Sequence, residues 1–135
     1  EHMTAARAEE IRRYIEAQGD RPISTQRVVE LVVDMHTGEL FQAALALWVA
    51  SAAEPQLRER VVTLETRVGR QVHRATVQML GVDDHKPGVR PLIQATLDMA
   101  RGLGLANLLG DDRQRRAPII AQWSALLDGA LNRSA

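Results

Sequence analysis

The sequence has 135 residues, 45% of them hydrophobic and 25% charged, and its 17 basic side chains are balanced by 17 acidic ones. This composition is typical of one globular domain with its own core and excludes a disordered chain, while zero net charge disfavours a DNA-binding surface, which usually carries a basic excess. The absence of cysteine excludes disulfides and thiolate metal sites and makes the cytoplasm the expected location. No apolar run approaches the roughly 18 residues that cross a bilayer, so no membrane contact is expected.

Helical periodicity dominates the first part of the chain. Residues 3–19 predict one helix, with Gly19 as its stop and a proline shortly after it. Residues 24–36 predict a second helix, capped by Ser24 or Thr25, with a broad stripe of apolar side chains.

The stretch 38–53, GELFQAALALWVASAA, predicts an apolar helix without a polar face. Large side chains fill one side of it, and alanines fill most of the other. A helix that is apolar all round must be covered all round, so we expect the other helices to surround this one. Phe41, Leu45 and Trp48 recur at i, i+4 and i+7, and they need a thick wall or a ligand to cover them.

Three further helices complete an all-α fold of six helices, and no strand is expected. Residues 55–80 form the longest helix, with Pro55 suited to its first position, and the stretch 81–88 is a loop by composition. The last helix follows the turn at Asp111 and Asp112 and contains Pro118.

The helix predicted over residues 89–109 carries two apolar faces instead of one. The first face holds large side chains, and the second is a small-residue seam made of Ala95, Met99, Gly102 and Ala106. A lone domain needs only one buried face on such a helix. The surplus face therefore indicates another helix pressing close, which another copy of the chain would supply.

Five segments carry a resemblance to a known family. EHMTAARAEEIRR is similar to a helix that joins a DNA-reading part to a regulatory domain. LFQAALALWVASAAEPQLRERV and LETRVGRQV give an apolar helix, an acidic-proline break and a long charged helix. LDMARGLGLANLLGDD, with Asp98, Arg101, Gly102 and Leu105, is similar to the penultimate helix, and RRAPIIAQWSALLDGAL to the last. Over nearly its whole length, the chain resembles the ligand-binding and dimerisation domain of TetR-type transcriptional regulators.

The resemblance implies a single all-helical domain over residues 1–135, whose last two helices form a four-helix bundle with those of a second copy. The family's N-terminal helix-turn-helix, roughly 45–50 residues for such a three-helix module, has no counterpart in this sequence. We therefore expect the DNA-binding domain to be missing from this chain, and we expect the intact protein to contact DNA only through it.

The homodimer that the resemblance implies would bury at least about 1,200–2,000 Å² in total. The alternative is that one face of the last two helices simply closes the core of a single protomer. The residues expected at or near the interface are Leu92, Thr96, Leu103, Ile120, Trp123 and Leu127.

The family also binds a small effector inside each protomer, and binding shifts the first helix and changes the spacing of the two DNA-reading domains. The bulky side of helix 38–53 is the expected pocket wall, and the expected effector is small and hydrophobic or aromatic. The alternative is that these positions are plain core and that each histidine has a hydrogen-bonded structural role. The residues expected to line the pocket are Met35, His36, Phe41, Leu45, Trp48, Val62 and His73, with the two histidines as polar anchors.

The sequence therefore predicts the effector-sensing, dimerising regulatory domain of a transcriptional repressor. One alternative is a helical interaction module without an effector, which would have no cavity around Trp48. Another is a small-molecule carrier or enzyme, which would place a polar, titratable cluster there. No phosphate-binding glycine loop, nucleophile elbow or paired-carboxylate motif occurs, and no two histidines are spaced i, i+4 on one helix. No enzyme activity, cofactor or metal is therefore expected.

Overall fold

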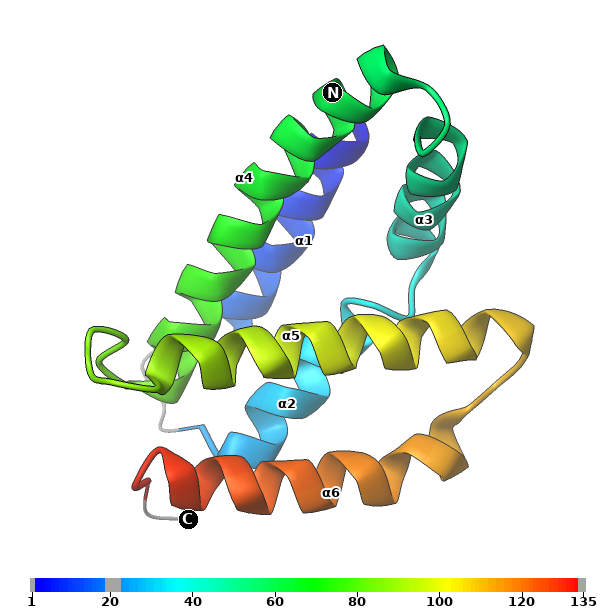
Figure 1. Cartoon of the computed structure of the whole chain (residues 1–135). Helices are drawn as coiled ribbons and strands as arrows, with labels where there is room; N and C mark the ends of the chain where they lie inside the picture. Colours follow the sequence, from blue (N-terminus) through cyan, green and yellow to red (C-terminus); the bar gives the residue numbers. More distant parts are fainter. Residues whose placement is uncertain (1, 19–22, 134–135) are drawn as a thin grey trace.

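The computed structural model describes residues 2–18 and 23–133, and helices are the only regular structure within these ranges, which confirms the all-α expectation. Six α-helices and one short 3₁₀ helix follow one another along the chain (Figure 1). The expected stop of the first helix, Gly19, lies outside the described residues. The elements are α1 (His2–Gln18), α2 (Thr25–Asp34), α3 (Glu39–Ser51), α4 (Pro55–Leu80), α5 (Val89–Ala106), η1 (Asn107–Leu109) and α6 (Arg113–Ala130).

Several helix ends are set by residues that the sequence analysis singled out. The Ser24 hydroxyl accepts a hydrogen bond from the backbone N–H of Arg27 at 3.1 Å and caps α2. Pro55 begins α4, and Gly81 ends it in the left-handed conformation with φ at 65°. The helix expected over residues 89–109 ends at Ala106, because its last three residues tighten into η1.

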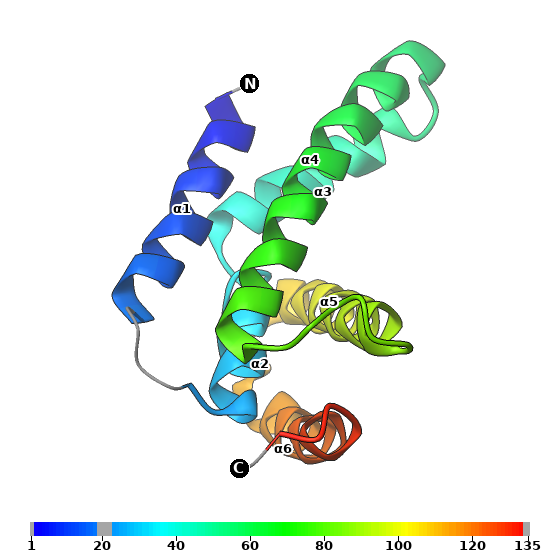
Figure 2. The same ribbon diagram turned by 90° about the vertical axis from the view of Figure 1, so that its left-hand side faces the viewer.

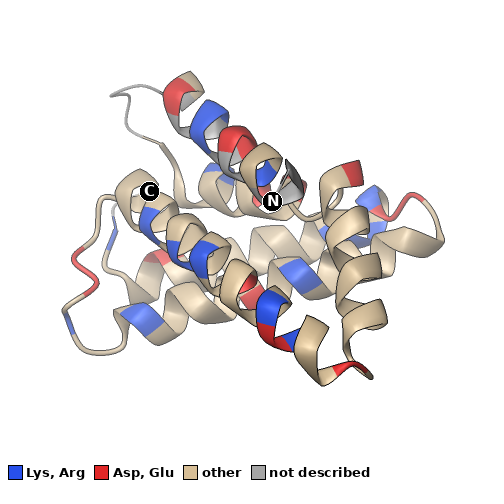
Figure 3. Ribbon diagram, turned by 90° about the horizontal axis from the view of Figure 1, so that it is seen from above, with Lys and Arg blue, Asp and Glu red and all other residues tan. Residues whose placement is uncertain are grey.

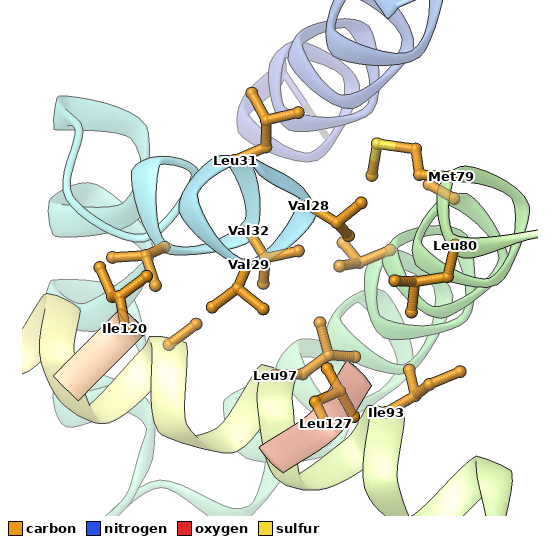
Figure 4. Packing of buried hydrophobic residues seen from close by; sticks show 14 of the residues in the cluster. Val28, Val29, Leu31, Val32, Met79, Leu80, Ile93, Leu97, Ile120 and Leu127 are labelled. Atoms are coloured by element: carbon orange, nitrogen blue, oxygen red, sulfur yellow. The ribbon is translucent and has the colours of Figure 1, made fainter. Parts of the chain in front are cut away.

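The hydrophobic core is built around α2. Five aliphatic side chains within six residues of this helix are at most 2% exposed. They are Val28, Val29, Leu31, Val32 and Val33. The C-terminal half of α4 covers one side of α2, and α5 and α6 cover another, as the close view in Figure 4 shows. Figure 2 shows α5 and α6 nearly end-on as one layer, with α2 beside them.

The expectation that helix 38–53 is surrounded on all sides is wrong for this chain. α3 packs against α1 and α4 at one end of the molecule (Figure 1). Only Phe41, Ala44 and Ser51 of α3 are buried, and Val49 is 77% exposed. Alanine methyl groups bury little apolar area, whereas the valines and leucine of α2 bury far more, so α2 takes the central position.

Gly104 sets how closely α5 approaches the segment between α2 and α3. A Cβ atom at Gly104 would overlap the backbone carbonyl of His36 and lie 2.8 Å from Cε1 of Phe41. A glycine is therefore required here, because any side chain would force the backbones apart. This close contact places His36 and Phe41 against α5, next to the cavity described below.

Basic and acidic positions are intermixed along the ribbons (Figure 3). Several of them form short ion pairs within one helix turn, such as Arg101 with Asp98 at 2.9 Å and Arg115 with Asp112 at 2.7 Å. Such exposed pairs contribute little to stability, about 0–1 kcal/mol each.

Candidate functional site

A cavity of about 250 Å³ lies between α1, α3, α4 and α5. Its apolar wall consists of Val68, Val72 and Leu97. The rest of the lining is polar or aromatic, and it is drawn from helices that are far apart in the sequence. These residues are Arg7 of α1, His36 after α2, Trp48 of α3, Glu65 and Gly69 of α4, and Arg101 of α5.

Three rings stack edge to face along one side of this cavity. The ring centroids of His36 and Phe41 are 4.9 Å apart with the planes at 74°, and those of Phe41 and Trp48 are 5.9 Å apart at 84°. The guanidinium of Arg101 lies 5.7 Å from the Trp48 ring centroid, which places a cation on the indole face. The aromatic wall is therefore fixed by packing between neighbouring rings.

His36 is buried and neutral at pH 7. Its Nδ1 lies 2.7 Å from the carbonyl oxygen of Val32, so this nitrogen carries the proton and donates. Burial, together with the positive charges of Arg101 and Arg7, lowers the pKa of His36 from 6.5 to about 4, against the opposing effect of the Val32 hydrogen bond.

An ion pair ties α1 to the wall of the cavity. Arg7 Nη1 donates to Glu65 Oε1 at 2.6 Å, and the two side chains are only 12% and 23% exposed. The pair joins helices whose residues are far apart in sequence, and both side chains line the cavity. A molecule in the cavity would therefore lie against the contact that holds α1 in place.

Two buried hydrogen-bond donors at the cavity have no partner. They are Nε1 of Trp48 and Nε of Arg101, and they are the buried side-chain nitrogens or oxygens without a partner among the described residues. A buried donor without a partner costs about 1–3 kcal/mol, so such groups mark sites where something else is expected to bind.

The structure places the residues predicted for the pocket in different surroundings. His36 and Trp48 line the cavity, and Phe41 packs between them in a second layer. Met35 and Leu45 are half-buried, and Met35 packs against the main core instead of lining the cavity.

Val62 and His73 were placed wrongly in the pocket. Val62 is 57% exposed, because its position on α4 turns it away from α3 and α5. His73 lies further along α4, where its Nε2 is 3.3 Å from Asp84 Oδ2.

His73 belongs to a second cluster, on the loop between α4 and α5. Asp84 contacts His73 and Arg90 there, both at 3.3 Å. Burial opposes the ionised form of Asp84, but the hydrogen bond to His73 and the charges of Arg90 and His85 hold its pKa below the usual range. Ligand-type atoms of Asp83, Asp84 and His85 lie within 4.8 Å of one another, but Asp84 is already paired with a cation, so we assign no metal site.

An open groove of about 700 Å³ connects the two clusters along α4 and α5. It is lined by His73, Asp84 and Arg90 at one end, and it shares Gly69 and Arg101 with the cavity at the other. The groove and the cavity therefore lie next to each other on α4 and α5.

Four residues predicted at the dimer interface are buried inside the single chain instead. Thr96, Leu103, Ile120 and Leu127 have no more than 7% of their surface exposed. The reason is that α2 packs against α5 and α6, so the larger face of α5 turns inward, together with Ile120 and Leu127 of α6. Leu92 and Trp123 remain half-buried at the surface, and Trp123 Nε1 donates to Thr96 Oγ1 at 3.0 Å.

Sequence reasoning missed the polar part of the cavity. Arg7 and Glu65 are 58 residues apart, so no local pattern joins them. Arg101 forms an ion pair with Asp98 at 2.9 Å, and the same guanidinium also lies against Trp48. The guanidinium of Arg101 can pair with Asp98 and still offer its flat face to an aromatic ring. This property of arginine was the available signal for a second contact.

None of the helices within the described ranges is long and apolar enough to cross a membrane. The sequence matches no protein-family model, no curated protein and no solved structure, so its function has to be argued from the site itself.

Proposed function

We propose that this chain is the effector-sensing, dimerising regulatory domain of a TetR-type transcriptional repressor, acting in the cytoplasm as a homodimer. In the intact protein, α1 would connect to a separate DNA-reading domain, and ligand binding would release that domain from DNA. The function of the chain itself is binding. Its cavity lining contains no hydroxyl or thiol side chain that could act as a nucleophile.

The observation that carries the proposal is the cavity against α1. A ligand can bias a two-state equilibrium only if it contacts the moving element differently in the two states. Here Arg7 of α1 lines the cavity and is held by Glu65 of α4. Occupancy of the cavity would therefore act directly on the contact that positions α1. A helical interaction module without an effector has no need of such a cavity around Trp48.

The surfaces of α5 and α6 support the homodimer. Exposed or half-buried side chains recur at alternating spacings of three and four on both helices, which is the repeat that packs helices side by side. We call these residues the outer seam. On α5 it comprises Leu92, Ala95, Met99, Gly102 and Ala106, and on α6 it comprises Ile119, Trp123, Leu126 and Ala130.

The two halves of the outer seam are aligned by a contact between the helices. Trp123 of α6 donates to Thr96 of α5, next to Ala95 of the seam. Figure 2 shows both helices as the outermost layer over α2, so their outer sides are open to a second copy. Leu126 is 57% exposed in the single chain, and a second α5–α6 pair would cover it.

A fragment screen by thermal shift tests the sensing function. Gly69 has open space around its Cβ position at the cavity, so Gly69→Leu would fill the cavity without a clash. Gly129→Leu on α6 is the matched control, since Gly129 also has open space and does not line the cavity. We expect compounds that raise the melting temperature of the wild type and of Gly129→Leu but not of Gly69→Leu. If no compound does so, or if all three proteins respond alike, the chain is an interaction module instead.

Sedimentation equilibrium tests the dimer. The wild-type chain should have twice the mass of one chain, and Leu126→Asp should have the mass of one chain because a charge would be buried at the seam. Val49→Asp is the control, because Val49 is an exposed apolar residue on α3, outside the outer seam. A wild-type chain of single mass, or an unchanged mass for Leu126→Asp, would contradict the proposed interface.

A further inference from the structure

The cavity lining contains two hydrogen-bond donors that have no acceptor. Trp48 Nε1 and Arg101 Nε are both without a partner. Glu65 accepts from Arg7 through Oε1, and its Oε2 and the unprotonated Nε2 of His36 are acceptors too, but neither of them pairs with the two free donors. A ligand that complements this lining has to bring acceptor atoms, and it gains the free energy of satisfying two buried donors.

The charge of the cavity lining is also unbalanced. Arg7 and Arg101 are cations, Glu65 is the facing carboxylate, and His36 is neutral at pH 7. Arg101, whose side chain is 43% exposed, also pairs with Asp98 at the surface at 2.9 Å, and such an exposed pair is weak. A single negative charge on a ligand would balance this lining, whereas a dianion would face Glu65 without compensation.

The size and the apolar wall restrict the rest of the ligand. An engineered apolar cavity of about 150 Å³ holds benzene. The 250 Å³ here leaves room for one ring and one small polar group. Val68, Val72 and Leu97 offer an apolar surface to the ring, opposite the aromatic wall that ends in Trp48.

We propose that the cavity binds a small single-ring aromatic monocarboxylate, whose carboxylate accepts hydrogen bonds from Trp48 Nε1 and Arg101 Nε. The ring lies on the apolar wall of α4 and α5. Both nitrogens are buried in the unliganded chain, so the side chains of Trp48 and Arg101 have to shift as the carboxylate binds. The charge of the carboxylate also competes with Glu65 for Arg7. This inference rests on the proposed sensing function and names the chemical class of its effector.

Isothermal titration calorimetry with benzoate and nitrobenzene tests the inference on the intact chain. The two probes have nearly the same shape, and only benzoate carries a charge. We expect benzoate to bind at least about tenfold more tightly than nitrobenzene, which is the factor that one hydrogen bond to a charged group provides.

Two conservative variants examine the donors one at a time. Trp48→Phe removes the indole N–H and keeps an aromatic ring, and Arg101→Lys removes Nε and keeps the charge. Each should weaken benzoate binding by about tenfold and change nitrobenzene binding by less than about twofold. The controls are Trp123→Phe, whose N–H is paired with Thr96, and Arg115→Lys, which pairs with Asp112 at the surface. Both should bind benzoate as the wild type does.

Equal affinities for the two probes, or unchanged benzoate binding by both Trp48→Phe and Arg101→Lys, would overturn the inference. So would the absence of benzoate binding at millimolar concentration. The sensing function would survive these results if the fragment screen still found compounds excluded by Gly69→Leu. If that screen also fails, the proposed function fails with the inference.

Discussion

The two ends of α4 lie in very different surroundings. Its C-terminal half, with Val68, Val72 and Met79, belongs to the core cluster that surrounds α2. Its N-terminal half carries the exposed Val62, and α3, which packs against α4, contributes no residue to that cluster. We call the part of the molecule around α2 and the C-terminal half of α4 the α2 half, and the part around α1, α3 and the N-terminal half of α4 the α3 half. The cavity lies where they meet, between α1, α3, α4 and α5.

This difference shows how one short chain combines a fixed part with a part that can move. The α2 half is stabilised by dense aliphatic packing, which resists small displacements. In the α3 half, α3 itself buries only Phe41, Ala44 and Ser51, and the edge-to-face rings and the Arg7–Glu65 ion pair add to the contacts. Elements that respond to ligands are expected to come from the less stable part of a fold.

The largest expected effect concerns His36, which lies at the junction of the two halves. Its pKa in the folded chain, about 4, is below the unfolded value of 6.5, so the unfolded chain binds the proton first as the pH falls. Stability is therefore complete above about pH 6.5 and declines as the pH approaches 4, by about 3 kcal/mol in total. Urea unfolding at a series of pH values should show this decline in the wild type and a smaller one in His36→Gln. Equal declines would contradict the assignment.

A matched pair of valine substitutions compares the two halves directly. Val29→Ala on α2 should lower the free energy of unfolding by about 2–3 kcal/mol, because Val29 is fully buried. Val49→Ala on α3 should change it by less than about 0.5 kcal/mol, since the side chain is largely exposed. Urea denaturation of both variants gives the comparison, and similar losses would show that α3 is packed as tightly as α2.

Two glycines on α5 test the close approach at the junction. Gly104→Ala should destabilise the chain by about 1–3 kcal/mol, because the new methyl group would overlap the His36 carbonyl. Gly102→Ala has open space at its Cβ and should stabilise the helix by about 0.5–1 kcal/mol. Thermal unfolding at a low protein concentration, where chains do not associate, measures both. A stable Gly104→Ala variant would mean that α5 is not held against this segment.

The smallest expected effect is that of Glu65→Gln, which breaks the ion pair with Arg7. We expect a loss of about 0.5–1 kcal/mol, since the pair is only partly buried. Proteolysis should cleave α1 faster in this variant than in Glu59→Gln, whose carboxylate is exposed on the same helix. Equal cleavage rates would show that Arg7–Glu65 does not hold α1.

Local features of the fold could be predicted from sequence, because caps and breakers act within a few residues. Ser24, Pro55 and Gly81 set helix ends at the expected places. The choice of the central helix could not be predicted, since total apolarity favours α3. Burial also depends on how many sides of a helix carry large side chains. The buried aliphatic residues of α2 occupy neighbouring positions and face several directions, whereas most of one side of α3 is alanine.

The candidate site was predictable only in its aromatic part. Phe41 and Trp48 share one helix with a regular spacing, so their pattern is visible in the sequence. Arg7, Glu65 and Arg101 meet only in three dimensions, because they come from three different helices. Similarly, the two-faced pattern of α5 was evident, but which face turns inward was decided by packing against α2.

Native-state hydrogen exchange, measured helix by helix, tests most directly whether the fold has a fixed and a yielding half. We predict that amides of α1 and α3 exchange through local openings. The free energy of these openings should be several kcal/mol, in order of magnitude, below that of global unfolding. Amides of α2 and of the C-terminal half of α4 should exchange only when the whole chain unfolds. A single opening free energy for all of these helices would contradict the account.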